Sequence, residues 1–333
     1  MNEPVQADTL IPPTWNPALA EALASRLSSL AGPGGSFGML EALATLLGMI
    51  HNSLAPQIGT VRVAFIVADH GFAPAAAGGA PQAADTLAAL RAGRLPLAAL
   101  ARTHDAAIEV LLASGAEPPF AMAGPTAGLV SKTADARVGP AMTTRQANAA
   151  LRQGMREGQR AQGGAIICAG WGAGTATGAA LVLGALTQRD PGEFMADDRE
   201  SRTCAEAVRD RHRVLWQPGA ARDPLDVLAA LGGLEVATLA GLMLGAAERR
   251  HAVLVDGVAA LAAVHVAMRI APYVGDYCIP VRSRSGRAVD AALALWRPAL
   301  PSALELDAME GTAGVLALPV LRSAAALLTA PPS

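Results

Sequence analysis

The sequence predicts an α/β fold: a doubly wound, mostly parallel sheet with helices on both faces, plus a small helical domain. Short, continuous apolar runs, typical of strands buried on both faces, alternate with longer Ala- and Leu-rich stretches of helical spacing. Two of these runs end in polar groups, at Asp69-His70-Gly71 and at Asp256-Gly257. Parallel sheets place their ligand-facing groups at such strand ends.

The first and last segments are helical rather than mixed. Leucines recur at helical spacing over Pro17–Leu30 and Met39–His51, and the chain ends in another Ala- and Leu-rich stretch. We expect these helices to form a small helical domain from residues 1–55 and 303–333. Residues 56–302 then form a large, Rossmann-like α/β domain.

Within the large domain, strands and helices follow one another in order. Strands are expected over residues 61–68, 106–112, 165–168, 252–255 and 277–281. Helices are expected over residues 83–92, 96–103, 144–160, from 177 onward, and over 204–215, 224–231, 235–249, 258–270 and 287–296. The long connection over residues 122–140 indicates a functional or interface loop.

Composition excludes several classes of protein. The 333 residues are 52% hydrophobic with a formal net charge of −2, and only 3% are aromatic. The scattered arginines and few aromatics argue against a nucleic-acid partner. Cys168, Cys204 and Cys278 lie far apart, which predicts neither a metal site nor a disulfide framework. No signal peptide or uninterrupted membrane span is expected, so the predicted location is the cytoplasm.

A glycine-rich turn follows the third strand. Gly170, Gly172 and Gly174 alternate with larger residues before a helical stretch. Such a turn exposes backbone N–H groups at a helix start, which suits a phosphate or carboxylate, but tight strand–helix packing without a ligand explains it equally. The turn matches neither the P-loop pattern nor the full dinucleotide fingerprint, which argues against a nicotinamide-dependent dehydrogenase.

Several motifs, in order and at compatible spacing, resemble one known family. They are GSFGMLEALATLLG (Gly35–Gly48), ADHGFA (Ala68–Ala73), KTADARVGPAMTTRQA (Lys132–Ala147), DPLDVLAALGGLEVATLAGLMLGAA (Asp223–Ala247), VLVDG (Val253–Gly257) and MEGTAG (Met309–Gly314). Together they resemble the nicotinate-nucleotide:dimethylbenzimidazole phosphoribosyltransferases, which make the lower-ligand nucleotide of cobalamin. The likeness runs from about Gly32 to Leu328.

The resemblance implies a transferase that needs no cofactor and no metal. Its substrates would be a small nucleotide and an aromatic base, and its assembly a homodimer with the site near the subunit boundary. Glu310 would be the catalytic base, although a carboxylate before Gly311-Thr312 is also a common helix-start residue. The substrate-binding residues that we expect are Gln82, Gly78, Asp69, His70, Trp171, Gly172, Gly174, Thr177, Asp256, Gly311 and Thr312.

The chain departs from the family pattern around the expected nucleotide. The family's GEMGIGNTT turn reads AGWGAGTAT over Ala169–Thr177, so Gly170 replaces a glutamate. Its SHRSAEPGH segment is shortened to VRSRSGR over Val281–Arg287, which supplies three arginines, and its lysine is lost near Cys204. Two interpretations stay open: an active transferase with altered selectivity for donor or base, or a degenerate paralogue that binds a nucleotide or pairs with an active subunit.

Overall fold

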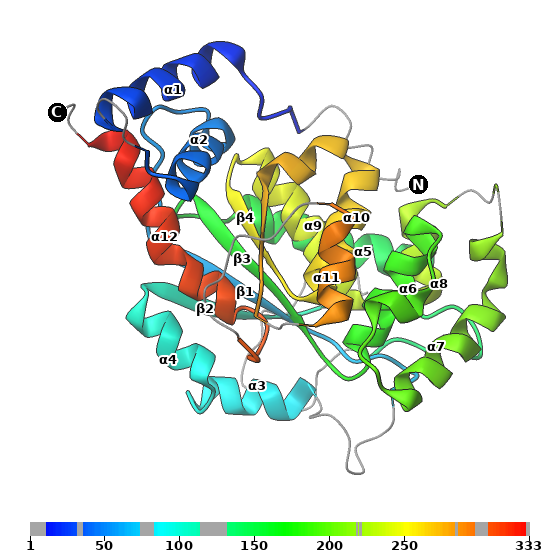
Figure 1. Ribbon diagram of the computed structural model, residues 1–333. Coiled ribbons are helices and arrows are strands. Elements are labelled where there is room, and N and C mark those ends of the chain that lie inside the picture. The colour runs from blue at the N-terminus through cyan, green and yellow to red at the C-terminus, as the bar shows by residue number, and fades with distance from the viewer. Residues whose placement is uncertain are drawn as a thin grey trace.

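One parallel sheet of five strands runs through the centre of the molecule (Figure 1). The computed structural model describes residues 11–31, 36–73, 83–113, 132–217, 219, 222–283, 286–296 and 306–330. The strands are β1 (Val61–Val67), β2 (Ala106–Leu112), β3 (Ala165–Trp171), β4 (Ala252–Asp256) and β5 (Cys278–Val281). The prediction of a parallel α/β sheet is therefore confirmed.

The strand order is β2-β1-β3-β4-β5. The chain moves from β1 to β2 on one side, then crosses back to place β3 on the other side of β1. Val67 pairs with Leu112 of β2 and with Trp171 of β3, so all three strands end at one edge. Beyond this edge the segments after β1 and β3 stay together, because the N–H groups of Ala68 and His70 donate to the carbonyl oxygens of Trp171 and Ala173 at 3.1 and 2.8 Å.

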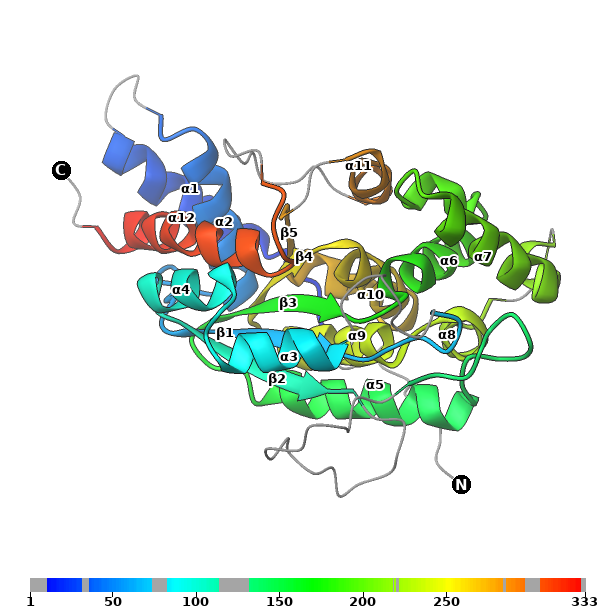
Figure 2. The same ribbon diagram turned by 90° about the horizontal axis from the view of Figure 1, so that it is seen from below.

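Helices cover both faces of this sheet (Figures 1 and 2). The described α-helices are α1 (Pro17–Ala31), α2 (Met39–His51), α3 (Ala83–Arg91), α4 (Pro96–Thr103), α5 (Thr144–Gln159), α6 (Thr175–Thr187), α7 (Arg199–Arg211), α8 (Pro224–Leu231), α9 (Leu234–Glu248), α10 (Val258–Ile270), α11 (Arg287–Ala294) and α12 (Thr312–Thr329). Short 3₁₀ helices are η1 (Pro191–Phe194), η2 (Arg213–Trp216) and η3 (Pro272–Tyr277). Helices α9 and α10 pack on one face, while α12 and α4 lie on the other.

Helices α5 and α9 pack unusually closely because glycines line their contact. A Cβ at Gly154 would lie 1.8 Å from the Thr238 carbonyl oxygen, and a Cβ at Gly241 would lie 1.8 Å from that of Leu151. No side chain fits there, so the two backbones touch directly. This contact holds the N-terminus of α9 against the sheet, close to the carboxyl ends of the strands.

Helix α12 packs on the sheet through small and branched residues. Gly314 lies against Ile167 of β3, and Val315, Leu318 and Leu321 are buried. By length and composition alone α12 could cross a membrane, and half of it is buried inside the molecule. Helices α1, α2 and α12 contact one another and share one hydrophobic core with the sheet. The two-domain division stays a prediction.

Several element boundaries differ from the sequence expectation, and two of the differences have a clear cause. Helix α7 begins at Arg199 rather than Cys204, because the Asp198 side chain accepts hydrogen bonds from the N–H groups of Glu200 and Ser201 and caps the helix. Strand β3 continues through Gly170 to Trp171 because β1 pairs with it to the end. The glycine turn therefore starts two residues later than the glycine pattern alone suggests.

Candidate active site

A cavity of about 830 Å³ opens at the carboxyl ends of β3, β4 and β5. Its walls come from segments far apart in the sequence: the glycine turn, η1, the N-termini of α10 and α11, and the turn before α12. The lining residues are Gly170, Trp171, Gly172, Gly174, Thr175, Ala176, Thr177, Phe194, Met195, Ala196, Asp197, Ser201, Gly257, Val258, Arg282, Ser283, Gly286, Arg287, Ala288, Val289, Asp307 and Glu310. This volume is large enough for a mononucleotide and a second ring.

The glycine turn forms one wall of the cavity and is fixed from behind by Asp69. The Ala173 N–H donates to Asp69 Oδ1 at 2.7 Å. A Cβ at Gly172 would lie 1.6 Å from the Ala68 carbonyl oxygen, so the close approach of the backbones requires glycine. Gly174 has φ +84° and is the N-cap of α6, with no side-chain capping bond. Because the first N–H groups of α6 have no acceptor within the helix, this wall suits an anion.

Two polar atoms at the same wall have no hydrogen-bond partner in the described part of the chain. One is Thr175 Oγ1, whose residue is only 6% exposed, and the other is the indole nitrogen of Trp171. Both residues line the cavity. A bound ligand could supply the missing partners, because buried polar groups in native proteins are nearly always hydrogen-bonded.

His70 lies behind the turn, not in the cavity. Its Nε2 is 2.8 Å from Glu235 Oε1, and both side chains are fully buried. The imidazole ring packs on α6 at Gly178, where an added Cβ would lie 2.1 Å from His70 Cε1. The Cβ atom of His70 itself lies close to Gly174. The His70–Glu235 pair therefore wedges α6 against α9 and sets the position of the α6 N-terminus.

We expect Gly178→Ala to destabilise the protein by about 1–3 kcal/mol, the usual cost of overpacking a core. The added methyl must displace the His70 ring. Urea unfolding of Gly178→Ala, His70→Ala and the double variant measures the coupling. The added methyl group should lower the free energy of unfolding much less in the His70→Ala background. Equal losses in the two backgrounds would show that the His70 ring does not pack against Gly178.

Glu310 projects from the turn before α12 and lines the same cavity as the glycine turn. Its residue is 8% exposed, and its Oε1 accepts the Val258 N–H at 3.2 Å. The carboxyl group rests on Gly257, which has φ +94° and where a Cβ would lie 2.0 Å from Glu310 Cδ. Glycine at this position therefore makes room for the carboxylate, which is held at the cavity wall and shielded from bulk water.

The turn that carries Glu310 is held by the carboxylate of Asp256, which is fully buried at the end of β4. Asp256 Oδ2 accepts the N–H groups of Gly311 at 2.9 Å and Gly314 at 3.2 Å. Asp256 also accepts the Ser283 N–H at 3.0 Å and the Ser283 hydroxyl at 2.6 Å. Ser283 Oγ in turn accepts the Ala313 N–H at 2.7 Å. Burial raises the pKa of Asp256, and these hydrogen bonds offset part of that rise.

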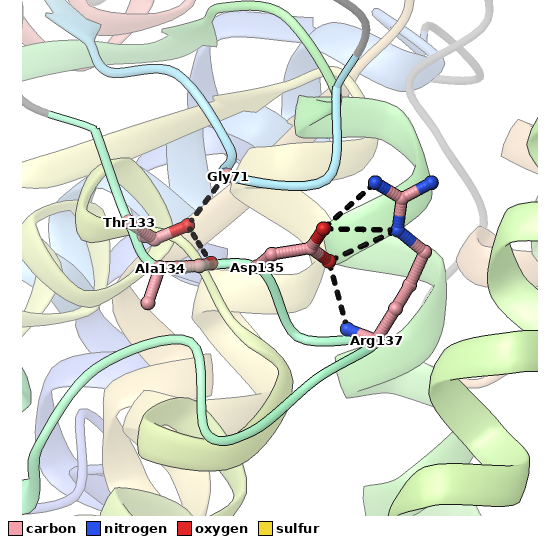
Figure 3. Close-up of polar contacts among 5 residues, drawn as sticks. All are labelled: Gly71, Thr133, Ala134, Asp135 and Arg137. Atoms are coloured by element: carbon pink, nitrogen blue, oxygen red, sulfur yellow. Dashed lines mark hydrogen bonds and ion pairs between the residues drawn. The ribbon is translucent and has the colours of Figure 1, made fainter.

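The segment after residue 131 closes over the end of β1 (Figure 3). Thr133 Oγ1 accepts the Gly71 N–H at 3.0 Å and donates to the Ala134 carbonyl oxygen. Asp135 binds the Arg137 guanidinium at 2.7 Å, and hydrogen bonds from Arg137 hold the pKa of Asp135 below its ordinary value. These contacts give Asp135 a place in the loop rather than in the cavity.

The structure brings together only part of the residue set expected from the sequence. Trp171, Gly172, Gly174, Thr177 and Glu310 line the cavity. The residues Asp69, His70, Asp256, Gly311 and Thr312 do not line it; the first three hold its walls through the bonds described above, and Gly311 is the N-cap of α12. Gly78 and Gln82 lie outside the described residues.

Sequence reasoning missed three groups that matter here. Glu235 follows the Gly232-Gly233 break at the start of α9, where a carboxylate is ordinary, so nothing in the sequence marked it as the partner of His70. Ser283 and Arg287 lie in the segment after β5, where the sequence indicated three arginines but no particular role for either residue. Only the packing of β4, β5 and α12 shows which of these side chains reach the site.

Comparisons with known proteins show which family the chain resembles. The family model described as "Phosphoribosyltransferase" matches residues 12–331. The nicotinate-nucleotide–dimethylbenzimidazole phosphoribosyltransferase of Variovorax paradoxus is 35% identical over 328 residues, covering 93% of this chain and 90% of that protein. That of Deinococcus radiodurans is 34% identical, covering 94% and 90%.

A solved structure shows the same fold. The crystal structure of the corresponding enzyme from Thermus thermophilus superposes with a TM-score of 0.79 at 27% identity, covering 96% of this chain and 97% of that one. The family match, the identity over almost the whole length and the shared fold lead to one conclusion. This chain belongs to the phosphoribosyltransferase family that includes the nicotinate-nucleotide–dimethylbenzimidazole enzymes.

Proposed function

We propose that this protein transfers the 5-phosphoribosyl group of nicotinate mononucleotide to a benzimidazole-type base, forming the α-ribazole phosphate of the cobalamin lower ligand. The observation that carries the proposal is the position of Glu310. Its carboxylate is buried and lines the same cavity as the glycine turn, whose backbone N–H groups suit an anion. Glu310 suits the N–H of an acceptor base, and the glycine turn suits the phosphate of the donor. The match to relatives named as these transferases favours this interpretation over a degenerate paralogue.

The reaction follows from these groups. One ring nitrogen of the benzimidazole attacks C1′ of the ribose, while Glu310 accepts the proton from the N–H of the same ring. The bond from C1′ to the nicotinate nitrogen breaks, and its electron pair returns to that nitrogen. The leaving group begins as a cationic pyridinium, so it needs no acid. The Val258 N–H holds one oxygen of Glu310, which orients the carboxylate toward the proton.

The remaining walls hold the substrates in line. We assign the 5′-phosphate to the N–H groups at the start of α6 and to the hydroxyl of Thr175 or Thr177. Trp171 offers a flat apolar surface beside the turn for an aromatic base. Fixing both reactants in one cavity replaces an encounter in solution with a pre-aligned displacement, which supplies much of the rate.

The test is direct turnover. The protein is incubated with nicotinate mononucleotide and 5,6-dimethylbenzimidazole, and both products are followed by liquid chromatography and mass spectrometry. We expect free nicotinate and the ribosylated base to appear in equal amounts. Nucleotide binding in a thermal shift without either product would contradict transfer and favour the degenerate paralogue.

We also propose that the protein acts as a cytoplasmic homodimer. Val138 and Val214 are 74% and 60% exposed, and Arg211 of α7 donates to the Val138 carbonyl oxygen, so the two segments adjoin on the surface. Exposed apolar groups of this kind suit contact with a second copy. The free cysteines suit a reducing compartment. Sedimentation analysis should give twice the monomer mass of 33.7 kDa, and a monomer at micromolar concentration would contradict the dimer.

A further inference from the structure

The cavity holds charged side chains of both signs, and most of them are already engaged. Arg282 pairs with Asp290 at 2.7 Å, and Asp197 pairs with Arg202 at 3.1 Å. Glu310 is buried against the Val258 N–H, and Asp307 is exposed. Arg287 is exposed, as Asp307 is, and within the described ranges no carboxylate pairs with it. The cavity therefore has a guanidinium available for a ligand.

The place of Arg287 in the fold points to a purpose other than stability. It is the first residue of α11, after the N-cap Gly286, and the cap makes no side-chain hydrogen bond. The helix dipole disfavours a cation in the first turn, so the fold gains nothing from arginine there. Yet Arg287, Ala288 and Val289 of this first turn all line the cavity. A cation next to small apolar side chains suits a flat ring that carries an acidic group.

The donor nucleotide named for the relatives has two anionic groups, a 5′-phosphate and the carboxylate on its pyridine ring. The cavity has two regions that attract anions: the start of α6 with the glycine turn, and Arg287 at the start of α11. The turn suits the phosphate because it offers several backbone N–H groups at once. The planar fork of a guanidinium suits a carboxylate.

Resting on the function proposed above, we infer that Arg287 binds the ring carboxylate of the nicotinate donor and thereby selects nicotinate mononucleotide over its amide analogue. Arg287 touches the leaving group and acts as a specificity-determining residue. It takes no part in proton transfer, which belongs to Glu310. Because a neutral carboxamide offers a guanidinium only one weak acceptor, the discrimination comes from the charge on the ring.

The test compares two donors that differ only in that charge. Values of kcat/KM are measured for nicotinate mononucleotide and nicotinamide mononucleotide, with dimethylbenzimidazole, in the wild type, Arg287→Gln, Arg287→Lys and Arg213→Gln. Arg213 is exposed on η2 and does not line the cavity, so its variant controls for the lost surface charge. Calorimetric Kd values for both nucleotides are measured in parallel, which gives the same comparison where transfer from the amide is below detection.

We expect Arg287→Gln to lower kcat/KM for the nicotinate donor about 10- to 100-fold, the usual loss for a hydrogen bond between charged groups. The value for the amide donor, or its Kd, should stay within about threefold by the same arithmetic. Arg287→Lys should keep part of the preference, and Arg213→Gln all of it.

The outcomes separate this inference from the proposed function. Wild-type turnover with an unchanged donor ratio in Arg287→Gln overturns the inference alone. Equal losses for both donors also overturn it, because Arg287 would then bind a group that the donors share, such as the phosphate. Absence of transfer in the wild type overturns the proposed function, while the Kd ratio still decides whether Arg287 reads the ring carboxylate.

Discussion

Replacing Glu310 by glutamine is expected to lower kcat about 10²- to 10⁴-fold, the range for loss of a general base. Glutamine keeps the shape of the side chain and an oxygen for the Val258 N–H, so the turn should stay in place. The amide cannot accept the proton of the benzimidazole N–H at neutral pH. Steady-state kinetics with both substrates measures kcat, and the KM for the nucleotide should change little because Glu310 faces the acceptor base.

The matched control is Glu206→Gln, an exposed position on α7 outside the cavity. It removes the same charge at a distance and should leave kcat unaltered. Unfolding curves of both variants must overlap that of the wild type for the comparison to concern chemistry. Turnover of Glu310→Gln at the wild-type rate would exclude Glu310 as the base and leave alignment of the substrates as the source of catalysis.

Replacing Asp256 by alanine should reduce both stability and activity. The change leaves the buried N–H groups of Ser283, Gly311 and Gly314 without their acceptor. Loss of one partner in a buried charged network costs about 3–5 kcal/mol. The same bonds hold the turn that carries Glu310, so kcat should fall even at temperatures where the variant remains folded. Urea denaturation gives the free energy of unfolding, and assays well below the midpoint give kcat.

Ser283→Ala provides the milder comparison for Asp256. It removes the hydroxyl that bridges Asp256 and the Ala313 N–H but keeps the backbone N–H of residue 283. The expected cost is about 1–3 kcal/mol, that of one unsatisfied buried donor. If Asp256→Ala cost no more than Ser283→Ala, then Asp256 would not be the centre of this network.

Asp256→Asn tests the sign of the pH dependence. Because burial raises the pKa of Asp256 in the folded state above its ordinary 3.8, folding favours the protonated carboxyl. The wild type therefore has this contribution in full below pH 3.8 and loses it as the pH rises through the raised value. Asparagine does not titrate. The free energy of unfolding of the wild type relative to Asp256→Asn should thus decrease with rising pH, and an increase would contradict the direction of the pKa shift.

The local elements follow from short-range patterns. The strand at Val61–Val67 is apolar apart from Arg62, and short apolar runs predict the neighbouring strands as well. Helix α5 begins where Thr143 and Gln146 form a reciprocal cap, a signal carried within four residues. The predicted boundary was wrong where a neighbouring strand set it. Trp171, for example, belongs to β3 because it pairs with Val67 of β1.

The sequence predicted only some of the residues that line the site. Glu310 was identified by resemblance, since a carboxylate before a helix start is common in chains without any active site. His70 and Asp256 were marked correctly as strand-end groups, but they were expected to bind substrate. The structure places both behind the cavity wall, bonded to Glu235 and Ser283.

The order of strands and helices along the chain, the glycine turn and the carboxylate of Glu310 before α12 are properties of the sequence alone, because each depends on neighbours within a few positions. Tertiary structure decided everything that joins distant segments. His70 meets Glu235 across 165 positions, and Asp256 reaches Gly311 across 55. Such pairings depend on how the strands are ordered and which face each helix covers, and no short-range pattern encodes that. For the same reason, only the folded chain shows that Arg287 shares a cavity with Glu310.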